Sequence, residues 1–98
     1  MEVIRRRKYC DGMVQELVHV EDGVVIMSSG IVLPGRHLLG RSGHNGTILV
    51  TTGALNINGH IVNSGFEVTL DPKEELWIQA DMRSSYVRHY SYPDSSEE

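Results

Sequence analysis

The sequence predicts an all-β protein, and three features of its 98 residues indicate this. Val, Ile and Thr together number 22, whereas Ala occurs only at positions 54 and 80, and β-branched side chains favour strands over helices. Ten glycines divide the chain at short intervals, and no window of about 12 residues has a helical apolar period. We therefore expect one β-barrel or rolled sandwich of short antiparallel strands.

The expected strands are defined by alternating apolar and polar residues, and their ends by turn residues. Asp22-Gly23 and Asn58-Gly59 suit tight hairpin turns, because these residue types tolerate a positive φ. Pro34-Gly35 and Asp71-Pro72 mark two further turns, and the polar, glycine-rich segment 40–46 is expected to be a loop. The predicted strands are residues 13–20, 24–28, 31–33, 36–39, 47–52, 54–57, 60–63, 66–70, 76–80 and 86–92.

Length, charge and cysteine content exclude several classes of protein. A chain of 11.0 kDa forms one domain, which we place at residues 1–92, with an acidic, disordered tail at 93–98. A net charge of −4 argues against nucleic-acid binding, and the single Cys10 cannot form an internal disulfide. No apolar run is long enough for a membrane span or a signal peptide. We therefore expect a cytoplasmic protein with neither nucleic acid nor membrane as a partner.

Several short motifs occur in an order that is typical of one family. The segment 65–77, G-F-E-V-T-L-D-P-K-E-E-L-W, is similar to the second half of a cupin motif. Residues 30–35 (GIVLPG), positions within 48–56, and Gly65, Leu76, Gln79, Tyr86 and Tyr90 fit the same pattern. Over residues 12–90 the chain thus resembles the small single-domain cupins of the pyrimidine/purine nucleoside phosphorylase family. The resemblance implies a cupin-like barrel that cleaves nucleosides with phosphate into free base and pentose 1-phosphate, with no metal or organic cofactor.

The candidate catalytic residues are cationic side chains that could hold phosphate. Arg36 and His37 are expected near the phosphate, with Arg88 as a further cation, because a dianion needs several donors. Arg88 shares a face of its strand with Tyr86 and Tyr90. Burying its guanidinium without an anion or carboxylate partner would be costly, so Arg88 is expected to be either an exposed charge or an anion ligand.

The candidate substrate-binding residues are Asn56, Trp77, Gln79 and Tyr86. Trp77 and Gln79 alternate onto one face of strand 76–80, and the apolar residues of that strand occupy the other face. An indole and an amide could stack on a nucleobase and hydrogen-bond to its edge. The alternative is that Trp77 is buried at a dimer contact.

Other functions remain open from the sequence. His37 and His44 lie seven residues apart, and Trp77 stands where a cupin would supply a third histidine, so no bound metal is expected. No nucleophile–base pair is evident, which leaves enzyme activity open. The alternative function is non-catalytic binding of a nucleoside or nucleotide, or a structural role as a subunit. The basic run 5–8 (RRRK) indicates a solvated edge strand, and the chain is expected to form a homodimer through its terminal strands.

Overall fold

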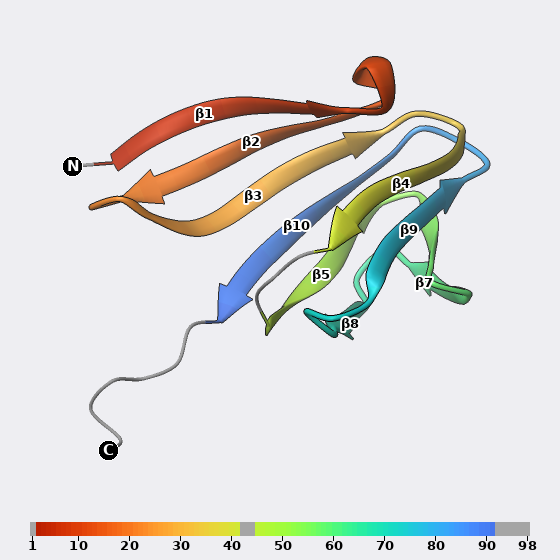
Figure 1. Cartoon of the computed structure of the whole chain (residues 1–98). Helices are drawn as coiled ribbons and strands as arrows, with labels where there is room; N and C mark the ends of the chain where they lie inside the picture. Colours follow the sequence, from red (N-terminus) through yellow and green to blue (C-terminus); the bar gives the residue numbers. More distant parts are fainter. Residues whose placement is uncertain (1, 42–44, 92–98) are drawn as a thin grey trace.

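The computed structural model describes residues 2–41 and 45–91, which form two antiparallel β-sheets (Figure 1). The larger sheet has the strand order β1-β2-β3-β10-β5-β8, and the smaller has the order β4-β9-β6-β7. A short 3-10 turn, η1 (Cys10–Gly12), joins β1 to β2. The strands are β1 (Glu2–Tyr9), β2 (Val14–Glu21), β3 (Val24–Val32), β4 (Gly35–Arg41), β5 (Asn45–Thr52), β6 (Ala54–Ile57), β7 (His60–Asn63), β8 (Glu67–Leu70), β9 (Glu75–Ala80) and β10 (Ser84–Ser91).

The predicted all-β fold is confirmed, and it is a rolled sandwich of two separate sheets rather than a closed barrel. The strands expected at 24–28 and 31–33 are one continuous strand, β3, because Gly30 pairs within the sheet instead of ending it. Both ends of the expected loop 40–46 belong to strands β4 and β5. The middle of that loop, Tyr92 and the predicted tail 93–98 lie outside the described residues.

The core fills the space between the sheets and follows the predicted alternation. In β9, Leu76, Ile78 and Ala80 are buried, whereas Trp77 is half-buried and Gln79 is exposed on the outer face. The largest fully buried side chain is that of Tyr86 on β10. Apolar residues of β2, β3, β5, β6, β7 and β8 complete the core.

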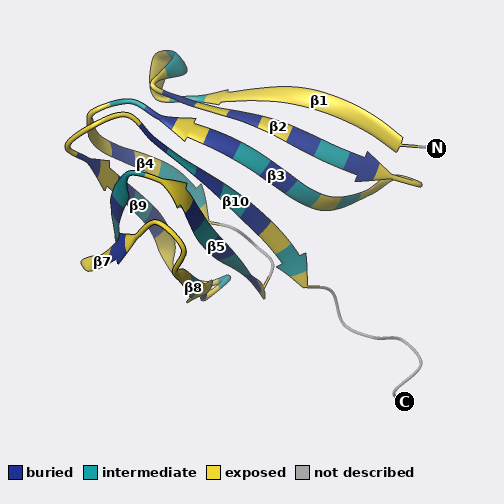
Figure 2. Ribbon diagram, turned by 180° about the vertical axis from the view of Figure 1, so that it is seen from behind, coloured by how far each residue is buried: buried dark blue, intermediate teal, exposed yellow. Residues whose placement is uncertain are grey.

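The smaller sheet covers only part of the larger one. Figure 1 shows β4, β9 and β7 beside the β10–β5 side of the larger sheet, with β1 at the far edge. Residues 2–8 of β1 are all exposed (Figure 2), so the basic run 5–8 lies on an edge strand as predicted. No helix in the described ranges is long and apolar enough to span a membrane.

Candidate functional site

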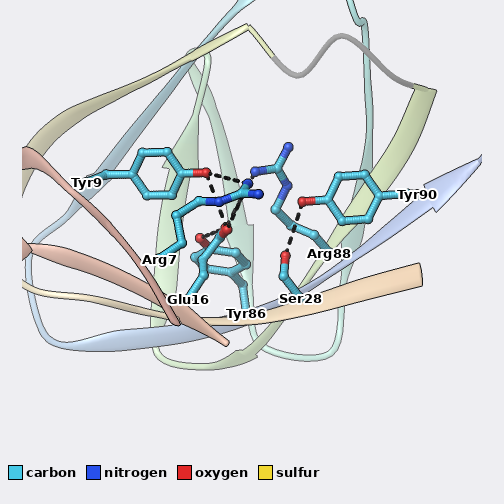
Figure 3. Close-up of polar contacts among 7 residues, drawn as sticks. All are labelled: Arg7, Tyr9, Glu16, Ser28, Tyr86, Arg88 and Tyr90. Atoms are coloured by element: carbon cyan, nitrogen blue, oxygen red, sulfur yellow. Dashed lines mark hydrogen bonds and ion pairs between the residues drawn. The ribbon is translucent and has the colours of Figure 1, made fainter. Parts of the chain in front are cut away.

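A group of polar side chains occupies the inner face of the larger sheet, where an apolar core would be expected. We call it the interior cluster, and it consists of Arg7, Tyr9, Glu16, Ser28, Tyr86, Arg88 and Tyr90 (Figure 3). These residues come from β1, β2, β3 and β10, which are neighbours in the sheet. The cluster therefore depends on strand order, since it joins residues 7–28 with residues 86–90.

The register of the sheet brings Tyr86 to Glu16. Glu16 on β2 pairs with Arg7 on one side and Gly30 on the other, and Gly30 pairs in turn with Tyr86. A Cβ at Gly30 would lie 2.5 Å from Tyr86 Oη, so the tyrosine ring occupies the space that a side chain there would need. Glycine at position 30 thus allows Tyr86 to reach across β3 to Glu16.

Glu16 is fully buried, and its carboxylate accepts several hydrogen bonds. The Tyr86 hydroxyl donates to Oε2 and the Tyr9 hydroxyl donates to Oε1 at 3.4 Å. Arg88 Nη1 donates to Oε2 at 3.4 Å, and Arg7 Nη1 lies 3.9 Å from Oε1. A buried carboxylate without such partners would be strongly destabilising, so these contacts hold Glu16 in the interior.

Arg88 is buried beside this carboxylate, with 4% of its surface exposed. Of the two alternatives expected for Arg88, the exposed charge is therefore wrong, because Glu16 supplies the counter-charge that allows its burial. The Arg88 guanidinium carbon also lies 5.1 Å from the centre of the Tyr90 ring, and the Tyr90 hydroxyl lies 3.3 Å from Ser28 Oγ. Arg88 Nε, however, is buried with no hydrogen-bond partner among the described residues.

Burial and neighbouring charges shift the pKa values of the cluster. Burial, and then the Glu16 carboxylate, raise the pKa of Tyr86 far above that of a free tyrosine, so its hydroxyl remains a donor. The pKa of Tyr9 is raised for the same two reasons. Burial opposes the charge on Arg88, but the oxygens of Tyr90, Glu16 and Tyr86 outweigh it, and the pKa of Arg88 is raised. Arg88 is therefore a permanent cation in the interior.

A second group of polar residues lies on the outer face of the smaller sheet. Arg36, Gln79 and Asn56 form one row across β4, β9 and β6, and Trp77 lies beside them. The Arg36 guanidinium carbon stacks 4.2 Å from the centre of the Trp77 ring. These four residues line an open groove of about 680 Å³, here called the outer groove, together with Asn58, Gly59, Glu74 and Glu75.

The seven residues proposed from the sequence are thus divided among separate places. The outer groove contains Arg36, Asn56, Trp77 and Gln79, whereas Tyr86 and Arg88 belong to the interior cluster. His37 follows Arg36 on β4 and therefore faces the opposite side. It is buried, and its Nε2 lies 2.8 Å from the Leu33 carbonyl oxygen. The structure does not place Arg36, His37 and Arg88 around a common phosphate.

Glu16, Arg7, Tyr9 and Ser28 are members of the interior cluster that the sequence reasoning missed. A signal for Glu16 was available, because it alternates with Val14 and Val18 and so lies on the apolar face of its strand. A carboxylate on an apolar face indicates a buried partner of opposite charge. No comparable signal marked Arg7 or Tyr9. Every residue of β1 apart from Tyr9 is exposed, so the strand has no buried apolar face on which a polar residue would stand out.

The cluster's chemistry suits anion recognition more than metal binding. The positive charge of its two arginines exceeds the negative charge of its one carboxylate, and its remaining members carry hydroxyl groups. Within residues 2–41 and 45–91, no group of three or more His, Cys, Asp or Glu side chains is arranged to hold a metal ion.

Comparison with known proteins gives matches among solved structures. No protein-family model matches the sequence, and no curated protein matches it. A protein of unknown function from Vibrio parahaemolyticus superimposes with a TM-score of 0.76 at 23% identity, covering 91% of this chain and 99% of the other. A protein of unknown function (DUF1255) from Acinetobacter sp. ADP1 gives 0.78 at 12% identity, covering 93% of both chains.

The third informative match is the cupin domain of CENP-C from Drosophila melanogaster, with a TM-score of 0.69 at 16% identity. It covers 90% of this chain and 75% of the other. Similarity at these identities establishes the fold. The chain therefore has the fold of a small cupin domain, formed here by two open sheets.

Proposed function

We propose that this protein is a non-catalytic cupin-like binding domain, and that the interior cluster holds a small anion of the carboxylate or phosphate class. The observation that supports this most strongly is Arg88 Nε, a buried donor without a partner among the described residues. Buried donors in folded proteins are nearly always paired, and an unpaired one costs about 1–3 kcal/mol. A bound anion would accept this hydrogen bond.

The orientation of the Arg88 guanidinium fits such a ligand. Its Nη1 is directed at Glu16, which leaves the edge formed by Nε and Nη2. Two parallel N–H groups on one edge of a guanidinium match the two oxygens of a carboxylate or phosphate. Glu16 thus fixes one side of Arg88 and presents the other side to a ligand.

Charge and access also favour a small anion. Arg7 and Arg88 together exceed the charge of Glu16, so the interior cluster is positive overall. The Arg7 side chain is 45% exposed while that of Arg88 is 5% exposed, and the cluster therefore runs from solvent into the interior. An anion could approach past Arg7 and bind at Arg88.

Phosphorolysis is supported less well by this geometry. The reaction requires the base, the sugar and phosphate in one site. Trp77 and Gln79 face outward from the smaller sheet, whereas Arg88 faces inward from the larger sheet. A single nucleoside could not stack on Trp77 while its phosphate partner contacts Arg88.

A second candidate function is binding of a planar ring, such as a nucleobase, in the outer groove. The stacked Arg36–Trp77 pair favours this, because it presents a cation–π surface next to the Gln79 amide. The two proposals use different residues, and they can be tested separately.

The experiment is isothermal titration calorimetry with inorganic phosphate, citrate, adenosine monophosphate and adenosine. The proposal predicts saturable binding of at least one anion and weaker binding of uncharged adenosine. Arg88→Lys retains the charge but loses the side-on donor pair, so it should weaken anion binding by about tenfold or more. Gln79→Ala is the control, since it lies in the outer groove and should leave anion binding unchanged.

Each of these claims has its own deciding result. Unchanged anion affinity in Arg88→Lys would exclude the interior site, and loss of adenosine binding in Gln79→Ala would instead support the outer groove. Chromatography of protein incubated with nucleosides and phosphate should show no free base. Phosphate-dependent release of base would overturn the non-catalytic proposal.

A further inference from the structure

The edge strand β1 has the properties of a docking site for another strand. It is eight residues long, and it pairs with β2 along its full length, from Glu2–Glu21 to Tyr9–Val14, without a register shift. It lies at the end of the larger sheet, so its outer backbone groups face no neighbouring strand of the sheet. An edge of this kind is a template for strand addition.

Proteins protect such edges by several devices, and β1 has only one of them. Proline, β-bulges and short length all prevent pairing with a further strand. Residues 2–9 contain no proline, and the regular register excludes a bulge. The remaining device is charge, supplied by four consecutive basic residues at positions 5–8. Charge excludes a partner of the same sign but attracts one of the opposite sign.

The charges on β1 are largely unpaired within the protein. Arg7 is directed into the interior cluster, where it contacts Tyr9 and Glu16. Arg5, Arg6 and Lys8 form no ion pair with any other residue in the described part of the chain. Because consecutive strand residues alternate between faces, Arg6 and Lys8 lie on the outer face and Arg5 lies on the inner face. The edge therefore carries unpaired positive charge on both of its faces.

We infer that β1 binds an extended acidic segment of a partner protein by antiparallel or parallel strand addition. Backbone hydrogen bonds to the free edge would supply affinity, and acidic side chains at successive positions would contact the basic residues on both faces. A second copy of this chain fits less well. Antiparallel pairing of two β1 strands about a twofold axis places residues of the same face opposite each other, so near-full-length pairing sets Arg5 opposite Arg5, or Arg6 opposite Arg6, of the second copy, and like charges opposite each other are destabilising.

The test is fluorescence polarisation with a labelled octapeptide of two Glu-Glu-Val-Thr units, using the full chain, because consecutive Glu residues place carboxylates on both faces of the peptide strand. Binding should be saturable and should weaken as salt is raised, because the contacts are solvent-exposed. The control peptide has the same sequence with every backbone amide N-methylated, which retains the charge but prevents pairing through either edge of the peptide. It should bind at least about tenfold more weakly, since strand pairing depends on those amides.

Charge reversal on β1 provides the matched protein variants. Arg6→Glu with Lys8→Glu should reduce peptide affinity by about tenfold or more. Lys73→Glu with Arg83→Glu makes the same change in net charge at exposed positions outside β1 and should have little effect. Arg88→Lys should also have little effect, which separates this surface from the interior cluster.

Four results would overturn the inference. These are absence of peptide binding, equal binding of the N-methylated peptide, equal losses in the two charge-reversal variants, and a dimer in light scattering that Arg6→Glu with Lys8→Glu dissociates. The last result would assign the edge to a second copy of this chain. Amide hydrogen exchange gives a direct structural readout, because bound peptide should protect amides of β1.

Discussion

Replacing Gly30 with alanine tests the contact on which the interior cluster depends. Gly30 has no positive φ, so alanine is compatible with the backbone itself. Its Cβ, however, would overlap the end of the Tyr86 ring and lie 2.5 Å from the hydroxyl oxygen. Tyr86 is 1% exposed and its hydroxyl is bound to Glu16, so the ring cannot move without loss elsewhere.

The expected loss combines two effects. Overpacking a buried position costs about 1–3 kcal/mol, and a hydrogen bond to a charged group contributes about 1.5–3 kcal/mol. Since the ring can relieve part of the overlap by giving up part of the hydrogen bond, we expect Gly30→Ala to lower the free energy of unfolding by about 3 kcal/mol. For a domain of this size that corresponds to a melting temperature lower by roughly 15 °C.

The assay is urea and thermal denaturation of Gly30→Ala in two backgrounds. The two backgrounds are the natural sequence and Tyr86→Leu, which lacks the ring atoms that overlap the new Cβ. In Tyr86→Leu, Gly30→Ala should be neutral or raise the free energy of unfolding by about 0.5 kcal/mol, because alanine makes the unfolded chain less flexible than glycine does. The coupling between positions 30 and 86 should thus exceed about 2 kcal/mol. An equal loss in both backgrounds would refute the reasoning, because the cause would then lie in the backbone and not in Tyr86.

Three further predictions concern the cluster and the outer groove. Because burial raises the pKa of Tyr86, only the unfolded chain loses the Tyr86 hydroxyl proton above about pH 10. The free energy of unfolding, measured by urea denaturation, should therefore be constant just below about pH 10 and fall above it by up to about 1.4 kcal/mol per pH unit. The fall should be less steep in Tyr86→Phe. Glu16→Ala leaves the Arg88 guanidinium buried without the Glu16 carboxylate, and it should lower the free energy of unfolding by about 3–5 kcal/mol in the same assay. The double variant Glu16→Gln with Arg88→Gln should lose less, because it removes both charges together. Asn58 has a φ of 50° and its Oδ1 accepts a hydrogen bond from the Trp77 backbone N–H at 2.7 Å, so Asn58→Ala should cost about 2 kcal/mol and Asn58→Gly, which relieves the strain, about 1 kcal/mol by calorimetry.

Much of the fold could be predicted because its determinants are local. The hairpin at Asn58-Gly59 and the alternation of β9 need only neighbouring residues. The alternation correctly separated Trp77 and Gln79 from the packed, apolar face of that strand. The same alternation could have separated Arg36 from His37, since adjacent strand residues face opposite sides. The continuity of β3 could not be predicted from local sequence, because a glycine such as Gly30 ends a strand in most contexts. Here the strand continues through Gly30, and the Tyr86 ring fills the space beside it.

The interior cluster could not be predicted because it depends on long-range strand order. Glu16 meets Tyr86 and Arg88 across separations of 70 and 72 residues. That contact requires β10 to lie next to β3, an arrangement that no local pattern encodes. Consideration of Arg88 alone left two alternatives, exposure or an anion ligand, and the structure shows that Arg88 is buried and that its Nη1 donates a hydrogen bond to a carboxylate of the protein itself.

The most direct test of the central claim is the NMR signal of the Arg88 Nε–H group. The signal is assigned by its disappearance in Arg88→Lys, and phosphate, citrate and adenosine monophosphate are then titrated separately. A bound anion at the free edge of Arg88 predicts a saturable downfield shift of this proton with the affinity found by calorimetry. An Nε–H signal that stays unchanged while calorimetry shows saturable anion binding would contradict the interior site and place the ligand elsewhere on the protein.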